Sequence, residues 1–110
     1  MIIFQIHTGI KALAHKTRIQ MVELLLSQSL CVGALAQYLG ISKAAASQHL
    51  QILRKAGLVK GEKIGYWTHY AVQTEELIKL GEGIKKLPEQ ISGLRDLNLD
   101  ICSKEDSIPK

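Results

Sequence analysis

The sequence predicts a mainly α-helical fold with one small β-hairpin, because of the order in which its patterns follow one another. Between residues 32 and 72 two short helical patterns meet at Gly40, Ile41 and Ser42, and two strand-like runs then follow around a tight turn. The second helical pattern, residues 43–56, has one apolar face and one polar face. Helix, turn, helix and hairpin in this order predict a winged helix-turn-helix, an α+β fold.

Length and charge indicate how the chain is organised. Its 110 residues support one domain with apolar surface left for pairing with a second copy. Residues 1–72 carry eight Lys or Arg against two acidic side chains, whereas residues 73–110 carry six basic against eight acidic ones. The positive charge thus coincides with the helix-turn-helix and hairpin, where DNA phosphates would be contacted. We expect a single domain over residues 1–102 and a flexible tail over residues 103–110.

Composition argues against several kinds of protein. Two cysteines are too few for a disulfide-stabilised secreted domain, and the N-terminus lacks the features of a signal peptide, which predicts a cytoplasmic protein. No apolar run approaches the roughly 20 residues that span a bilayer, so we expect no membrane partner. No paired carboxylates, glycine-rich phosphate loop or nucleophile elbow occur, and the four histidines are dispersed. We therefore do not expect an enzyme.

The N-terminal third predicts two helices and a short strand. The first helix ends near residue 14, because its apolar residues recur at helical spacing up to that point: Ile3, Ile6, Ile10 and Leu13. Thr17 is the predicted N-cap of the second helix, which ends near residue 27. Residues 30–32 are short and β-prone.

Residues 32–56 predict the helix-turn-helix itself. Val32, Leu35 and Leu39 give the first of its helices an apolar face, and Gly40 is the expected left-handed C-cap. Ser42 then caps the second helix. On that helix the predicted packed face is Ala46, Leu50 and Leu53.

Residues 58–72 predict the wing, as strands 58–63 and 66–72 around Ile64 and Gly65. Residues 74–101 are the expected dimerisation region. Pro88 should divide this region into a helix over residues 74–86 and a second one from residue 88, because proline lacks a backbone donor. Its apolar seam occupies the a and d positions of one heptad frame, namely Leu77, Leu80, Ile84, Leu87, Ile91, Leu94 and Ile101, with Asn98 at the remaining a position.

Two motifs resemble the ArsR/SmtB family of bacterial winged-helix repressors. Residues 12–18 are similar to the motif at the start of the family's domain, and residues 47–59 are similar to its recognition-helix signature. The resemblance runs from about Ile10 to Val72. It implies a homodimer paired through the N- and C-terminal helices, an operator with an inverted repeat, and repression relieved by a metal ion or a thiol-directed signal.

The metal chemistry implied by the resemblance carries over only in part. The family's arsenic and cadmium sensors place two cysteines around one valine before the first helix of the DNA-binding pair, and here only Cys31 stands in that motif. Its zinc and nickel sensors draw Asp, His and Glu ligands from the helix after the wing, yet residues 74–87 contain no Asp and no His. We expect no required cofactor, and a soft metal ion of the arsenite, cadmium, lead or zinc class stays open as an inducer.

The polar face of residues 43–56 and the wing supply the predicted DNA contacts. Gln48 can bridge N6 and N7 of adenine, Ser47 can bond base edges, and Ala44 leaves room for a thymine methyl group. Basic side chains would contact phosphates, and Tyr66 at the turn is the expected groove contact. The predicted set is Ser42, Lys43, Ala44, Ser47, Gln48, Gln51, Arg54, Lys55, Lys63 and Tyr66, with Lys60 as a further phosphate contact.

Three residues keep two interpretations each. His49, on the packed side of its helix, is either a hydrogen-bonded structural histidine or a DNA-backbone contact. Cys31 and Cys102 form a metal or redox sensor if their sulfurs converge, with His7 or His15 as a possible third metal donor. Otherwise Cys31 is a small core residue and Cys102 an exposed thiol near the tail.

These observations predict a sequence-specific, homodimeric DNA-binding repressor whose recognition helices enter successive major grooves about one DNA turn apart. The alternative is a winged-helix dimerisation or protein-interaction module without an inducer site. Salt separates the two hypotheses, because DNA binding through phosphates weakens steeply as the salt concentration rises.

Overall fold

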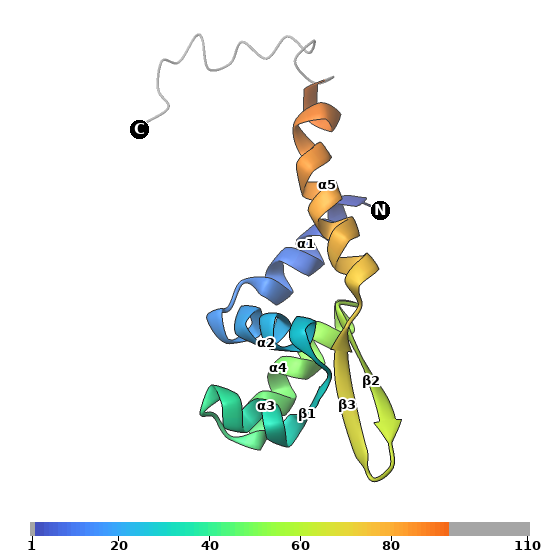
Figure 1. Cartoon of the computed structure of the whole chain (residues 1–110). Helices are drawn as coiled ribbons and strands as arrows, with labels where there is room; N and C mark the ends of the chain where they lie inside the picture. Colours follow the sequence, from blue (N-terminus) through green and yellow to red (C-terminus); the bar gives the residue numbers. More distant parts are fainter. Residues whose placement is uncertain (1, 93–110) are drawn as a thin grey trace, which may run out of the picture.

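The computed structural model describes the backbone of residues 2–92 and the side chains of residues 5–89. Helices dominate, and a small antiparallel sheet completes the winged helix-turn-helix, which confirms the predicted fold class (Figure 1). The remaining residues, including the predicted tail and Cys102, lie outside the described part. The elements are α1 (Ile2–Leu13), α2 (Lys16–Ser27), β1 (Leu30–Cys31), α3 (Val32–Leu39), α4 (Lys43–Lys55), β2 (Val59–Ile64), β3 (Trp67–Val72) and α5 (Thr74–Ser92).

The sheet has the strand order β1-β3-β2, so β3 is its central strand. Ile64 pairs with Trp67, which leaves Gly65 and Tyr66 as a two-residue turn. The predicted turn at Ile64 and Gly65 was therefore wrong by one residue. The physical reason is that the first position of such a turn needs a positive φ, which Gly65 supplies at 65°, whereas β-branched Ile64 favours the strand.

The C-cap of α3 and the N-cap of α4 are the predicted residues, but the N-cap of α2 is not. Gly40 caps α3 in the left-handed conformation, with φ 66°, and the Ser42 hydroxyl accepts a hydrogen bond from the Ala45 backbone N–H at 3.0 Å. Thr17 is not the cap of α2. That position belongs to His15, whose Nδ1 accepts from the Thr17 backbone N–H at 3.1 Å, because a neutral imidazole nitrogen can replace the usual side-chain oxygen.

The core lies among α2, α3, α4 and the base of the wing. The predicted inner face of α4, Ala46, Leu50 and Leu53, is buried there. The largest fully buried side chains are Met21, Leu35, Leu53 and Val59, which come from four different elements. Because these side chains interlock the elements, the recognition helix α4 is held firmly with its polar face outward.

Helix α5 is continuous from Thr74 to Ser92, with Pro88 inside it. The predicted break at Pro88 was wrong. Proline removes the one hydrogen bond that would reach the Ile84 carbonyl group, and both residues are exposed, so water can bond that carbonyl in its place. Within the described residues Leu80 is buried and Leu77 and Leu87 are partly buried, whereas Ile84 is exposed. The predicted seam positions Leu94, Asn98 and Ile101 lie outside the described residues.

Helices α1 and α5 pack closely at the end of the molecule opposite the wing tip (Figure 1). A Cβ added at Gly9 would lie 2.7 Å from Leu80 Cδ2, and one at Gly83 would lie 3.1 Å from Ile6. Each helix therefore receives a large side chain of the other over a glycine. In the described part of the chain, no helix combines the length and apolar character of a bilayer span.

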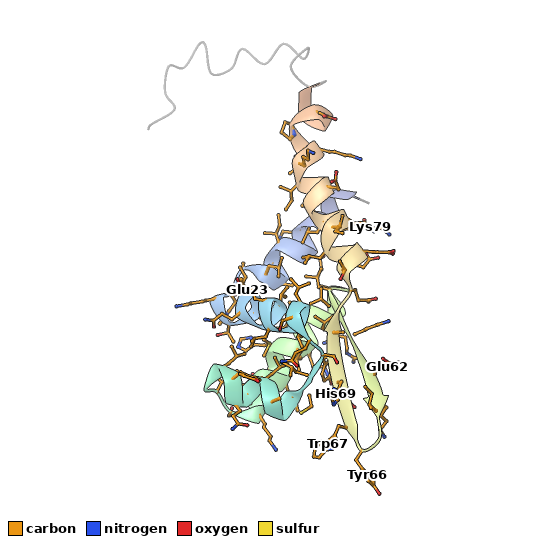
Figure 2. The ribbon with its side chains drawn as sticks, in the orientation of Figure 1. Glu23, Glu62, Tyr66, Trp67, His69 and Lys79 are labelled. Atoms are coloured by element: carbon orange, nitrogen blue, oxygen red, sulfur yellow. The ribbon has the colours of Figure 1, made fainter. Side chains whose placement is uncertain are left out.

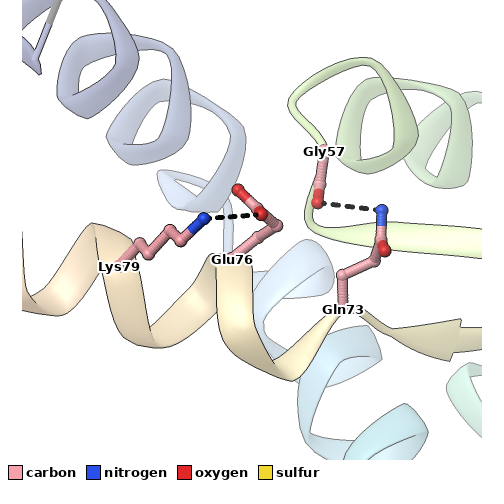
Figure 3. A network of polar contacts seen from close by, with 4 residues as sticks. All are labelled: Gly57, Gln73, Glu76 and Lys79. Atoms are coloured by element: carbon pink, nitrogen blue, oxygen red, sulfur yellow. Dashed lines mark hydrogen bonds and ion pairs between the residues drawn. The ribbon is translucent and has the colours of Figure 1, made fainter.

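A short polar link joins the end of the recognition helix to the start of α5. The Gln73 side-chain amide donates to the Gly57 carbonyl oxygen at 3.4 Å, and the Gln73 backbone N–H donates to the Leu58 carbonyl oxygen at 2.7 Å (Figure 3). On the next turn of α5 the Lys79 ammonium group lies 3.5 Å from a Glu76 carboxylate oxygen. Gln73 thus connects the residues that follow α4 to the start of α5.

Candidate DNA interface

The exposed face of α4 carries the side chains that sequence analysis assigned to DNA. Three of the assigned residues are already engaged within the protein, since the Ser42 hydroxyl caps α4 and the Gln51 Oε1 atom accepts from Arg54 Nη2 at 3.3 Å. Among the described residues, no hydrogen bond engages the side chains of Ser47 or Gln48, and both are exposed. These two polar groups are therefore available to bond base edges. The exposed residues of α4 are Lys43, Ala44, Ser47, Gln48, Gln51, Ile52, Arg54 and Lys55.

Lys55 lies apart from the other assigned basic residues. It lines a groove of about 700 Å³ formed by α1, the end of α4 and α5, where its neighbours include Glu76, Lys79 and Lys86. Lys43, by contrast, stands at the N-terminal end of α4, at the helix-turn-helix turn. A phosphate contact by Lys55 stays a prediction, and its position beside α5 makes it the least favoured of the set.

The wing carries the remaining assigned residues. Lys60 and Lys63 are exposed on β2, and Tyr66 at the turn is 96% exposed. Figure 2 shows Tyr66 and Trp67 at the far end of the hairpin, with Tyr66 pointing away from the helical body. The tip is thus the part of the hairpin best placed to reach a groove.

His49 holds the recognition helix to the N-terminal helices. Arg18 Nη1 donates to His49 Nδ1 at 3.1 Å, and Arg18 Nε donates to the Ala12 carbonyl oxygen. The His15 ring stands 4.6 Å from the His49 ring between centroids. The interpretation of His49 as a hydrogen-bonded structural histidine is confirmed. The contacts of His49 with Arg18 and His15 were not predicted from the sequence, although both residues lie in the motif of residues 12–18 that carried the family resemblance.

Burial lowers the pKa of His49 below its usual 6.5, and the electrostatic effects of the neighbouring His15 and Arg18 act in the same direction. Protonation would also remove the acceptor that Arg18 uses, because an imidazolium has no free lone pair. Since the unfolded chain takes up this proton more readily, the contribution of His49 to stability is complete above pH 6.5 and declines as the pH falls.

We therefore expect the free energy of unfolding to decrease as the pH falls below about 6.5, and His49→Gln to reduce that slope. Urea denaturation at a series of pH values measures it. The exposed His7 on α1 supplies the control, since His7→Gln should retain the slope of the native protein. Equal slopes in the native protein and His49→Gln would contradict the prediction.

The structure places Cys31 beside a histidine that sequence analysis did not consider. Cys31 is partly exposed on β1 and pairs across the sheet with His69 on β3, which pairs on its other side with Glu62. Directly paired residues share one face of a sheet with Cβ atoms about 5 Å apart. Only strand register could have revealed this row. Within the described residues no group of three or more His, Cys, Asp or Glu side chains is arranged to hold a metal ion, and Cys102 lies outside them.

The winged helix-turn-helix with an exposed polar face on α4 is typical of a DNA-binding transcription regulator, a class of protein distinct from enzymes. Comparison with known sequences gives the family. Residues 15–60 match the profile described as "Bacterial regulatory protein, arsR family". The chain belongs to this family.

Relatives of known name agree with the assignment. A protein of Vibrio cholerae named transcriptional activator HlyU is 36% identical over 78 residues, which cover 71% of this chain and 72% of that protein. Transcriptional repressor SdpR of Bacillus subtilis is 31% identical over 67 residues, covering 61% of this chain and 74% of that repressor. Both relatives regulate transcription, in opposite senses according to their names.

Solved structures extend the comparison to the fold. The structure of reduced HlyU from Vibrio cholerae superposes with a TM-score of 0.62 at 34% identity, covering 71% of this chain and 83% of that one. The homodimeric winged helix-turn-helix domain of Mb0332 from Mycobacterium bovis has a TM-score of 0.62 at 28% identity, covering 89% of this chain and 84% of that one. The Mb0332 domain is described as DNA-binding.

Proposed function

We propose that this protein is a homodimeric repressor that binds an operator with an inverted repeat, in the cytoplasm where bacterial DNA is found. The observation that carries the proposal is the exposed face of α4, where Ser47 and Gln48 have no hydrogen-bonding partner among the described residues and the opposite face is fixed in the core. A rigid helix with free polar side chains is what base readout in a major groove requires. Repression then needs only that the bound dimer occupies the operator.

Pairing through the terminal helices is supported by the apolar surface that α1 and α5 leave uncovered. Ile10 on α1 and Ile78 and Ile84 on α5 are large exposed apolar residues, and the groove of about 700 Å³ lies between these helices. A partner copy would remove that surface from water. The Mb0332 domain, which has a similar fold, is homodimeric, and this supports a homodimer here.

We propose that a thiol-directed signal acting at Cys31, together with Cys102, releases the repressor from its operator. The Cys31 thiol is partly exposed and lies opposite His69 on the neighbouring strand, and a cysteine thiolate is the form that reacts with oxidants and soft metals. By linkage, a signal that lowers operator affinity must act more readily on the free protein than on the DNA-bound protein.

The DNA-reading proposal is tested by fluorescence anisotropy with an operator selected from random DNA. Gln48→Ala should weaken binding to the selected operator by about 1–3 kcal/mol and weaken binding to unrelated DNA much less, because a bidentate base contact is lost only on the selected sequence. The exposed Gln37 on α3 provides a matched Gln→Ala control outside the recognition helix. Equal losses on both DNAs would exclude Gln48 as a base-reading residue.

The release proposal is tested with the same assay under reducing conditions, under oxidising conditions and with added soft metal ions. One of these treatments should abolish operator binding by the native protein, and Cys31→Ser should bind with unchanged affinity and without sensitivity to that treatment. Operator binding that no treatment alters would overturn this part of the proposal and leave the repressor function intact.

A further inference from the structure

The tip of the wing is an apolar surface of unusual exposure. Ile64, Tyr66 and Trp67 expose 53%, 96% and 64% of their surfaces. Ile64 and Trp67 pair directly across the hairpin, so their side chains share one face, and Tyr66 lies beyond them in the turn. Three large apolar side chains thus form one projecting edge, which we call the wing-tip cluster.

The wing-tip cluster contains no positive charge. Basic side chains on the wing are confined to Lys60 and Lys63 of β2, and residues 59–72 include no arginine. Electrostatic recognition of a narrow minor groove uses Arg or Lys inserted into it. The tip of this wing therefore lacks the groups for that kind of recognition and presents apolar rings in their place.

The position of the wing-tip cluster favours DNA as its partner. The wing follows α4 directly and extends about 17 Å from Val59 to Ile64, toward the end of the molecule that holds α3 and away from α5 (Figures 1 and 2). Lys60 and Lys63 are exposed on β2, the strand that leads to the tip, and their positive charges complement the DNA phosphates. The wing-tip cluster lies at the opposite end of the molecule from the apolar surface of α1 and α5 (Figure 1).

We propose that Tyr66 and Trp67 act as a wedge against a minor-groove base step, partly unstacking it and bending the operator. Apolar side chains inserted between base steps kink DNA in this way. The cost depends on the step, since pyrimidine–purine steps such as TA unstack easily and A-tracts are stiff. The wing therefore adds a preference for deformable DNA beside the major-groove site. This inference rests on the proposed DNA-binding function and adds a second means of sequence discrimination to it.

The experiment measures DNA bending by energy transfer between dyes at the two ends of a selected operator, together with affinity by anisotropy. We expect the native protein to bend the DNA, and the Tyr66→Ala/Trp67→Ala double variant to lose the bend and about tenfold in affinity, as loss of base–aromatic contacts would cause. Operators built with a TA step at the position that the wing reaches should bind the native protein more tightly than operators with an A-tract step there, and the double variant should show no such preference. Tyr66→Phe keeps the ring and should retain both bending and step preference.

The outcomes separate this inference from the proposed function. Equal bending and equal step preference in the native protein and the double variant would overturn the wedge while DNA binding stands. A native protein that binds no selected DNA would overturn the proposed function itself. Loss of repression in the double variant with binding and bending unchanged would assign the tip to a protein partner and overturn the wedge. Thermal denaturation should show the double variant folded, because both side chains are mostly exposed.

Discussion

Operator affinity is expected to fall by about 10³- to 10⁵-fold when the salt concentration rises from 50 to 200 mM, because a complex with six to ten phosphate contacts releases that many counterions. Four exposed basic side chains per protomer are placed for phosphate contacts, and the proposed homodimer doubles them. A slope of about −0.9 per contact then gives about −7 in a plot of log affinity against log salt. The four are Lys43, Arg54, Lys60 and Lys63.

Two lysine variants with the same change in charge make this prediction specific. Lys63→Gln on the wing should make the slope shallower by about 2, since each protomer of the dimer loses one phosphate contact. Lys79→Gln should leave the slope unchanged, because Lys79 lies on α5 next to Glu76, remote from the wing (Figure 2). A flat salt dependence in the native protein would favour the alternative hypothesis of a protein-interaction module.

Leu53→Ala should lower the free energy of unfolding by about 2–5 kcal/mol, the range for a leucine whose removal leaves a cavity in a close-packed core. The Leu53 side chain is 0% exposed on the inner face of α4. Ile52 is the next residue toward the N-terminus and is 41% exposed, so Ile52→Ala deletes a side chain of equal size at the surface. The cost of that change should stay near 0.5 kcal/mol.

Urea denaturation of the native protein and both variants measures the difference at matched protein concentration, because a dimer's stability depends on that concentration. The two variants should differ in stability because only the inner face of α4 is buried in the core. Equal losses of stability for Leu53→Ala and Ile52→Ala would show that the two faces of α4 are not differently buried.

Sequence patterns predicted most of the fold because apolar residues recur at regular spacings along its helices and strands. The apolar spacing of Ala46, Leu50 and Leu53 identified the buried side of α4, and Gly40 and Ser42 marked the turn before it. The errors fell at positions decided by local geometry. Pro88 was accommodated in an exposed stretch of helix, and His15 took the cap position that the residue preferences assign to Thr17.

The site was predictable only where it lies on one element. The polar face of α4 follows from helical spacing alone, so the exposure of Ser47 and Gln48 was predicted without a structure. Contacts between elements were not found, since nothing in the spacing of residues 18 and 49 reports that Arg18 reaches His49. The pairing of Cys31 with His69 likewise depends on strand register, and the place of Lys55 beside α5 depends on how the helices cross.

Gln73 couples the position of α5 to that of the recognition helix α4. Its side chain and backbone hold the residues that end the recognition helix, and α5 begins at the following residue. In the proposed homodimer, where α5 joins the subunits, a tilt of α5 would therefore be transmitted to α4 through Gln73. The angle between the two recognition helices of that dimer, and the spacing of the DNA sites that they can reach, would then depend on the tilt of α5.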